Sequence, residues 1–288
     1  MIFARAQGRL GNQLFFLTAL LRARSHNEVV VATGFRELVD TFPTFKENFP
    51  RFHNVSKNRW KSLHADKFLL EAVKLRLAGN LALSSTNGEL TRSSALTKGV
   101  VLSAGFFQDE RLIDEAPIIV LRNDLAAREW SFTQKLELSG DGHNPQPRCF
   151  VHVRRGDYLN WPDEEYPAAL PAGWYQEQVE SIRQSQPSTR FLVFSDDTAF
   201  CRREFSGVQN LDVVEGSVAQ TFLAMSLCDS AVLSASSLSW WGAKLASITS
   251  PGPFLAPEHW FLWPRGHWRE DDKMRHSSFL EWRPVVGG

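Results

Sequence analysis

The sequence predicts an α/β fold in which a parallel β-sheet is covered by helices on both faces. From Phe150 onward, short apolar runs of strand length alternate with segments of helical periodicity, a succession typical of parallel sheets. A second observation concerns the N-terminus, where a strand at 2–5 leads through a glycine turn into an apolar helix that ends near Arg24. The third is the stretch 138–147, whose density of turn residues indicates a link between two domains.

That link separates a predicted N-terminal domain, residues 1–140, from a predicted C-terminal domain, residues 141–288. A chain of 288 residues is long enough for two domains of ordinary size. We expect the C-terminal domain to carry the clearer parallel sheet, with the last helix of the chain able to pack back on the N-terminal domain.

The composition is that of a globular protein and excludes some classes of partner. Hydrophobic residues make up 43% of the chain and charged residues 22%, and 32 Lys and Arg balance 32 Asp and Glu. Because the net charge is zero, we expect no nucleic-acid partner and only small, locally bound anions. The three cysteines have neither close pairing nor metal-ligand spacing, and no signal peptide or membrane span is visible. The sequence therefore predicts a cytoplasmic protein with reduced thiols.

The N-terminal domain is the less regular half. After its first strand comes a Gly-x-x-Gly turn, and such a strand–turn–helix unit can present backbone N–H groups to an anion. The Asn12-Gln13 pair then opens the apolar helix, where Leu or Ala would serve packing better, and this indicates a role outside the core. The remaining expected elements are strands at 28–32 and 100–104 and a helix at 66–77 within the otherwise irregular stretch 35–94.

The C-terminal domain shows a regular succession of elements. Its strands are short apolar runs bounded by turn residues, and its helices carry apolar side chains at helical spacing, such as Tyr175, Val179 and Ile182. We expect strands at 150–154, 190–194, 211–214 and 231–234, and helices at 175–183, 218–227 and 239–246.

The stretch 150–158 reads as a buried strand that ends in a charged turn. Alternation puts His152 and Arg154 on one face, just where the strand ends. Ligands of open α/β sheets bind at the carboxyl ends of the strands, and the donor fork of a guanidinium fits phosphate oxygens two at a time. Arg154 is therefore either part of an anion site or part of a structural salt-bridge knot with Arg155 and Asp157.

Two more strand ends are expected at the same edge of the sheet. They are the turn at Ser195 and Asp196 and the serine-rich turn 234–239, which opens the next helix. A helix start offers free N–H groups and a partial positive charge, so with Arg154 it would form a cradle for a diphosphate. Plain helix capping is the alternative, but capping needs one serine, whereas this turn carries four.

Asp229 precedes the neighbouring strand. A carboxylate there could accept two hydrogen bonds from the donor edge of a guanine base, and the alternative is a solvated turn at a helix end. No Asp-x-Asp pair follows a strand, and no His/Asp cluster has metal spacing. If a nucleoside diphosphate leaves during a reaction, we expect Arg154 and the serine-rich helix start to bear its charge without a metal ion.

Five sequence blocks stand out together. They are Gly8-Arg-Leu-Gly-Asn-Gln-Leu-Phe15, Gly105-Phe-Phe-Gln108, His152-Val-Arg-Arg-Gly-Asp-Tyr158, Phe194-Ser-Asp-Asp197 and Ser234-Ala-Ser-Ser-Leu-Ser-Trp-Trp-Gly-Ala243. They occur in the order seen in the family 11 glycosyltransferases, the α-1,2-fucosyltransferases that use GDP-fucose, and the chain resembles that family over most of its length. The block around Arg154 is also similar to the more distant α-1,6- and protein O-fucosyltransferases. Two positions depart from the family pattern, since Ala235 stands where Asn is common and Leu238 where Phe is common.

The resemblance implies a GT-B fold, with two Rossmann-like domains facing across a cleft. It also implies an enzyme that transfers L-fucose from GDP-fucose to the 2-hydroxyl of a galactoside, with inversion and without a metal ion. No cofactor is implied, because GDP-fucose is the donor substrate. Within this resemblance Arg154 stabilises the leaving GDP. The predicted catalytic residues are Arg154, Asp157 and Asn12, and the predicted donor-binding residues are His152, Asp229, Ser236, Ser237, Ser239, Gly11, Gln13 and Asp196.

Several alternatives stay open at this point. Asp157 is the preferred base for the acceptor hydroxyl, with the carboxylates of loop 163–165 or a phosphate oxygen as alternatives. A fucosyltransferase of another linkage, α-1,6 or protein O-linked, would share the donor site. Six tryptophans in the last fifty residues suggest a non-catalytic glycan-binding protein as a rival. A dinucleotide-dependent oxidoreductase is opposed by the glycine spacing. The expected acceptor is a galactose-terminated glycan, and a lipid-linked acceptor would bring peripheral membrane contact.

Overall fold

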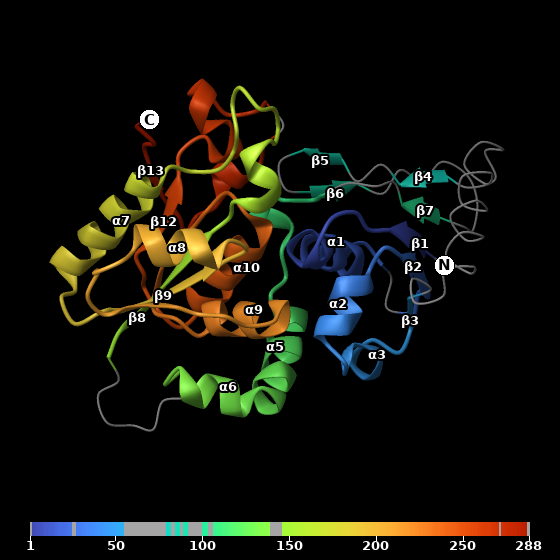
Figure 1. The fold of residues 1–288 in the computed structure, drawn as a ribbon. Helices are drawn as coiled ribbons and strands as arrows, with labels where there is room; N and C mark the ends of the chain where they lie inside the picture. The colour runs from blue at the N-terminus through green and yellow to red at the C-terminus, as the bar shows by residue number, and fades with distance from the viewer. Residues whose placement is uncertain are drawn as a thin grey trace. The chain divides into compact units, whose positions relative to one another are not determined.

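The chain divides into two units, each built around a parallel β-sheet (Figure 1). Unit 1 is Met1–Leu125 and unit 2 is Ala126–Gly288. The computed structural model describes residues 2–24, 27–54, 79–81, 84–86, 89–91, 100–102, 106–138, 146–270 and 272–286. The predicted helix at 66–77, most of the predicted link 138–147 and the first residue of the block at 105–108 lie outside the described residues.

Among the described residues, the sheet of unit 1 has five strands in the order β3-β2-β1-β7-β4, all paired in parallel. The first strand is central, so the chain builds outward on one side through β2 and β3 and then crosses to the other side. The strand order therefore reverses between β1 and β7. The strands are β1 (Ile2–Arg5), β2 (Val30–Thr33), β3 (Phe52–Asn54), β4 (Gly79–Leu81) and β7 (Val100–Leu102), and a separate antiparallel pair is β5 (Ser84–Thr86) and β6 (Glu89–Thr91).

Helix α1 (Leu10–Ala23) is buried on most sides, as its nearly continuous apolar sequence predicts. The aromatic residues that follow are core: Phe35 and Phe45 both pack edge-on against Phe52 at centroid distances of 5.2 and 5.0 Å. The predicted irregular stretch 35–94 is therefore ordered at its start. The other helical elements of this part of the chain are α2 (Arg36–Thr41), α3 (Phe45–Asn48), η1 (Glu110–Leu112) and α5 (Ala116–Arg128).

In the part of unit 2 that the structure describes, the sheet has six strands in the order β10-β9-β8-β11-β12-β13, again all parallel. The chain goes from β8 to β9 and β10 on one side, and then crosses to β11 on the other side of β8. Figure 1 labels β8, β9, β12 and β13 of this sheet and the helices α7, α8, α9 and α10 beside it. The strands are β8 (Arg148–Val153), β9 (Arg190–Ser195), β10 (Leu211–Val213), β11 (Ser230–Val232), β12 (Phe254–Pro257) and β13 (Glu281–Arg283).

Alternation along β8 separates two faces of the unit 2 sheet. Cys149, Val151 and Val153 belong to one core cluster with Tyr175 of α7 (Ala172–Ser185) and with apolar residues of α8 (Thr198–Glu204). The side chain of His152 therefore lies on the opposite face. Further helical elements are α6 (Trp130–Lys135), η2 (Gly156–Leu159), α9 (Val218–Ser226), α10 (Ser237–Ala246), η3 (Trp260–Arg265) and η4 (Met274–His276).

The predicted α/β class is confirmed, with a parallel Rossmann-type sheet in each unit. Every strand and helix expected in the C-terminal domain is present close to its predicted bounds. The expectation that the last helix packs on the N-terminal domain stays a prediction; the last described element is β13, which pairs with β12 of the unit 2 sheet. The GT-B arrangement across a cleft stays a prediction. None of the described helices is both long enough and apolar enough to cross a membrane.

Candidate functional site

Three neighbouring strands of unit 2, β9, β8 and β11, end at the same edge of the sheet. This edge is also where the strand order reverses, because β8 leads to β9 on one side while β11 flanks it on the other. At such a switch point the connecting loops diverge and leave room for a ligand outside the carboxyl ends of the strands. The predicted convergence of the three strand ends is confirmed.

His152, the penultimate residue of β8, is 7% exposed, and its Nδ1 lies 2.8 Å from Ser234 Oγ in the turn after β11. Burial, together with the positive charge of Arg154 and against a smaller opposing effect of Asp196, lowers the pKa of His152 to about 4. The imidazole is therefore neutral at physiological pH. A neutral ring can exchange hydrogen bonds with a ligand without adding charge to the site.

Arg154 follows β8 directly, and its side chain is 17% exposed. One terminal nitrogen, Nη1, lies 2.7 Å from Asp196 Oδ2, and the other, Nη2, donates to Asp157 Oδ1 at 2.5 Å. The guanidinium carbon also lies 5.6 Å from the ring centroid of Tyr158. The structural salt-bridge knot considered for this turn thus exists, and it lies at the edge where a ligand is expected.

The turn after β9 holds this knot in place. The Arg155 backbone N–H donates to Asp196 Oδ1 at 2.9 Å. A Cβ on Gly156 would come within 2.6 Å of Asp196 Oδ2, so the glycine leaves the space that this carboxylate occupies. Asp197 is the N-cap of α8, since its Oδ1 accepts the Phe200 N–H at 3.0 Å.

The serine-rich turn opens α10, as predicted. Ser236 is the N-cap, and its Oγ accepts the Leu238 N–H at 3.3 Å. Ser239 is fully buried and its hydroxyl donates to the carbonyls of Ser234 and Ser236 at 3.1 and 2.9 Å. Capping and turn closure therefore account for Ser236 and Ser239, whereas the partly exposed Ser237 lies in the first turn of the helix.

Tyr158 and Ser234 belong to this group of residues but are absent from the predicted site list. Tyr158 Oη donates to the Ala235 carbonyl at 2.7 Å, which joins the loop after β8 to the turn after β11. Burial raises the pKa of Tyr158 far above its usual value, so the hydroxyl stays protonated. Both residues lie inside sequence blocks that carry the family resemblance, and membership of these blocks is the signal by which the sequence could have identified them.

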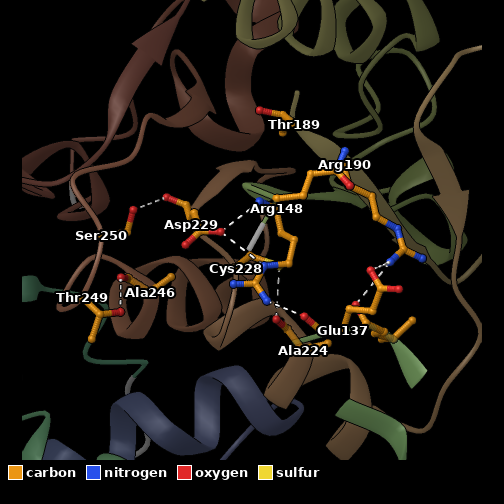
Figure 2. A network of polar contacts seen from close by, with 12 residues as sticks. Glu137, Arg148, Thr189, Arg190, Ala224, Cys228, Asp229, Ala246, Thr249 and Ser250 are labelled. Atoms are coloured by element: carbon orange, nitrogen blue, oxygen red, sulfur yellow. Dashed lines mark hydrogen bonds and ion pairs between the residues drawn. The ribbon is translucent and has the colours of Figure 1, made fainter. Parts of the chain in front are cut away.

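The structure separates Asp229 from the other predicted donor ligands. It precedes β11, so it lies at the amino-terminal edge of the sheet, opposite the edge that carries His152 and Arg154. Its Oδ2 accepts the backbone N–H of Arg148 at 2.9 Å and lies 3.4 Å from Arg148 Nε, and its carbonyl accepts the Ser250 hydroxyl at 2.6 Å (Figure 2). Because strands in this sheet are parallel, a residue before a strand and one after a neighbouring strand lie at opposite edges.

The predicted residues of unit 1 follow β1. Asn12 Oδ1 accepts a hydrogen bond from Gln108 Nε2 at 2.8 Å, and these residues follow β1 and β7, the strands at the switch point of this sheet. Gly8 has a left-handed φ of +77°, and a Cβ there would come within 2.3 Å of Asn12 Nδ2. Gln108 was not among the predicted site residues, although its sequence block was recognised.

Two neighbours of Asn12 are occupied within unit 1. Gln13 is 2% exposed, donates to the Gly8 carbonyl at 3.0 Å and accepts the Leu38 N–H at 2.9 Å, so both ends of its carboxamide stabilise the turn. Gly11 is buried in the first turn of α1. The Leu10 N–H at the start of this helix donates to Glu37 Oε2 at 2.8 Å. A carboxylate of the protein therefore lies at the helix start for which the sequence suggested a bound anion.

No three His, Cys, Asp or Glu side chains in the described part of the chain are grouped so that they could hold a metal ion. The three cysteines are free and buried.

Comparison with known proteins identifies the family. The profile of Glycosyl transferase family 11 matches residues 105–260. The O-antigen biosynthesis glycosyltransferase WbnK of Escherichia coli is 28% identical over 173 residues, and the alignment covers 54% of this chain and 54% of the relative. The chain thus spans about half the length of that relative.

Two other relatives align over more of their length. The alpha-1,2-colitosyltransferase of Escherichia coli is 25% identical over 91% of this chain and 92% of the relative. The galactoside 2-alpha-L-fucosyltransferase SEC1 of Bos taurus is 25% identical over 96% of this chain and 72% of its own. A solved structure from glycosyl transferase family 9 of Veillonella parvula covers 100% of this chain and 88% of its own with a TM-score of 0.51 and 8% identity, a likeness of fold alone. Because the family profile matches residues 105–260, more than half of the 288, this protein belongs to glycosyl transferase family 11.

Proposed function

We propose that this glycosyltransferase transfers L-fucose from GDP-fucose to the 2-hydroxyl of a galactoside, with inversion at the anomeric carbon and without a metal ion. The observation that carries the proposal is the position of Arg154, a guanidinium held at the switch point of a parallel sheet. Support for the linkage comes from two relatives whose names specify α-1,2 or galactoside 2-α transfer.

The diphosphate of the donor binds in unit 2 in this proposal. Arg154 supplies a planar donor fork, and the first turn of α10 supplies backbone N–H groups, the Ser237 hydroxyl and a partial positive charge. The neutral His152 contacts Ser234, in the turn that leads into α10. We leave Asp229, Gln13 and Ser239 out of the proposed donor site because their polar atoms bind the protein itself.

The reaction is a single displacement. The galactose 2-hydroxyl oxygen forms a bond to the anomeric carbon of fucose while the bond from that carbon to the β-phosphate oxygen breaks, and GDP leaves with the bonding electron pair. The hydroxyl proton passes to a base, for which we propose Asp157. Negative charge grows on the β-phosphate during this step, so a guanidinium that meets it there binds the transition state better than the ground state. Asn12 of unit 1 is proposed, from the family resemblance, to contact the transferred sugar.

The acceptor is proposed to be a galactose-terminated glycan of a bacterial surface polysaccharide, since one relative is named for O-antigen biosynthesis. A lipid-linked acceptor would bring the enzyme to a membrane surface, and the cytoplasmic location stays a prediction.

A second donor is favoured by one observation. The relative with near-complete alignment is an α-1,2-colitosyltransferase, so an activated colitose is an alternative donor for the same linkage. GDP-fucose and the activated colitose should therefore each be offered with a panel of β-galactosides in excess EDTA, and the linkage of each product determined. Transfer to a position other than the 2-hydroxyl would contradict the proposed linkage, and loss of transfer in EDTA would contradict metal independence.

Replacing Arg154 tests the observation that carries the proposal. Arg154→Ala should lower turnover about 100- to 1000-fold, the usual effect of losing one preorganised donor to a developing oxyanion. Arg154→Lys should also lose most of the activity, because an ammonium lacks the planar fork. Steady-state rates are measured beside Arg202→Ala, which removes an arginine of unit 2 whose side chain is 54% exposed and paired with Glu215. Turnover at the wild-type rate in folded Arg154→Ala would refute the role of Arg154.

A further inference from the structure

The two carboxylates bound to Arg154 differ in how they are held. We propose that Asp157 occupies the position of a diphosphate oxygen on Arg154 and is displaced when the donor binds, whereas Asp196 stays and positions the guanidinium. This inference rests on the proposed function, because it takes the diphosphate of the donor as the ligand that replaces Asp157.

Asp196 is held from three directions. One oxygen, Oδ1, accepts the Arg155 backbone N–H at 2.9 Å, and the other, Oδ2, lies 2.7 Å from Arg154 Nη1. The missing side chain of Gly156 leaves the space that this carboxylate fills, since a Cβ would come within 2.6 Å of Oδ2. Its side chain is 27% exposed. A carboxylate with a backbone donor and a charged donor on opposite oxygens cannot leave without losing both hydrogen bonds.

Asp157 is held much less firmly. Its carboxylate binds Arg154 Nη2 across three residues of the same turn, and 64% of the side chain is exposed to solvent. The carboxylate of such a pair is well solvated once it leaves the guanidinium, so the ion pair holds Asp157 only weakly. An incoming anion can therefore replace Asp157 as the hydrogen-bond acceptor of Arg154 Nη2 with little loss of free energy.

Charge explains why the exchange matters for donor binding. One guanidinium faces two carboxylates, so the group carries a net negative charge before any ligand arrives. A diphosphate that binds Nη2 competes with Asp157 for the same donor and is repelled by its charge as long as the carboxylate stays nearby. Asp157 thus lowers the affinity of the enzyme for the diphosphate of the donor and of the product GDP, whereas Asp196 raises that affinity by orienting the guanidinium of Arg154.

The displacement also sets an order of events. Asp157 is tied to Arg154 until the diphosphate arrives, so its carboxylate becomes free for another partner only in the donor complex. The donor is therefore expected to bind before the acceptor.

The test measures the dissociation constant of GDP by isothermal titration calorimetry for the wild type, Asp157→Asn and Asp196→Asn. Asp157→Asn should bind GDP about 5-fold more tightly, the effect of removing one like charge at about 4 Å in water. Asp196→Asn should bind GDP about 5- to 10-fold more weakly and lower kcat, because Asn still accepts the Arg155 N–H but no longer pairs with the guanidinium. Asp212→Asn is the control, since Asp212 is a 54% exposed carboxylate paired with Arg190. Its GDP affinity should equal that of the wild type.

Whether Asp157→Asn binds GDP more tightly or more weakly than the wild type decides the proposal. Because position 157 is exposed, we expect this variant to fold normally, and thermal unfolding checks that it does. Unchanged or weaker GDP binding by Asp157→Asn would overturn it. In the double variant with Arg154→Gln the gain should vanish, because the donor that the two anions share is gone; a gain that persists there would also overturn the proposal. If wild-type protein does not bind GDP at all, the proposed function itself fails.

Discussion

At the scale of single residues, the end of β8 places a neutral base beside a permanent cation. His152 and Arg154 lie on one face, two residues apart, yet burial keeps the imidazole uncharged while two carboxylates surround the guanidinium. The positive charge of this edge thus comes from Arg154, from Arg155, which pairs with Asp197, and from the start of α10. This explains why a single substitution at Arg154 should remove most of the activity, whereas a change at His152 should alter stability and its pH dependence.

The pH dependence of stability provides a test for His152. Its folded-state pKa of about 4 lies below the value of about 6.5 expected for the unfolded chain, so the unfolded state takes up a proton first on acidification. The contribution of this residue is therefore fully present above about pH 6.5 and is lost as the pH falls toward 4, by roughly 2 to 3 kcal/mol.

Urea unfolding of wild type and His152→Asn between pH 4 and about 8 measures that loss. The variant should show the flatter curve, because the carboxylates that also titrate in this range are common to both proteins. Parallel curves would mean that burial does not hold the imidazole neutral.

At the scale of elements, the position of α10 depends on one close helix contact. A Cβ on Gly242 would come within 2.7 Å of Met225 Cβ in α9, closer than two such atoms can lie. The helix that opens with the serine-rich turn is thus placed by the absence of a side chain six residues after its N-cap Ser236. The packing of α9 and α10 therefore fixes where the free N–H groups of that turn point.

Gly242→Ala should destabilise the protein by about 1 to 3 kcal/mol, since α10 must move away from α9 or distort. Gly173→Ala is the matched control in α7: a Cβ there meets nothing within 4 Å, and the change should stabilise the helix by about 0.5 kcal/mol. Denaturant unfolding gives both values, and GDP affinity of Gly242→Ala should fall as the start of α10 shifts. Equal stability of the two variants would contradict the role of this contact.

At the scale of the whole molecule, both units repeat one design. Each is a parallel sheet that begins at a central strand, and in each the polar side chains of the candidate site follow the strands at the switch point. Unit 1 places Asn12 and Gln108 there, and unit 2 places His152 and Arg154 there. The proposed function assigns GDP binding to unit 2 alone and gives Asn12 a part in the transfer step.

Asn12→Ala should therefore lower kcat roughly 10- to 100-fold, the range expected when a reacting group is misplaced, and leave the dissociation constant of GDP unchanged. Gln108→Ala should have a smaller effect of the same kind, because it removes only the partner that orients Asn12. Calorimetry and steady-state kinetics separate the two quantities. Weaker GDP binding by Asn12→Ala would contradict this division between the units.

The sequence by itself determined the α/β class, the bounds of the elements in unit 2 and the strand ends that carry His152, Arg154 and the serine-rich turn. These follow from local signals, because alternation, helical spacing and turn residues act over a few positions. Only the tertiary structure decided which polar groups are used internally. Gln13 meets the Leu38 N–H from 25 residues away, and Asp229 meets Arg148 from 81 residues away. Partners so distant depend on the tertiary fold, which no local pattern encodes, and the parallel pairing of β11 with β8 put Asp229 at the opposite edge from Arg154.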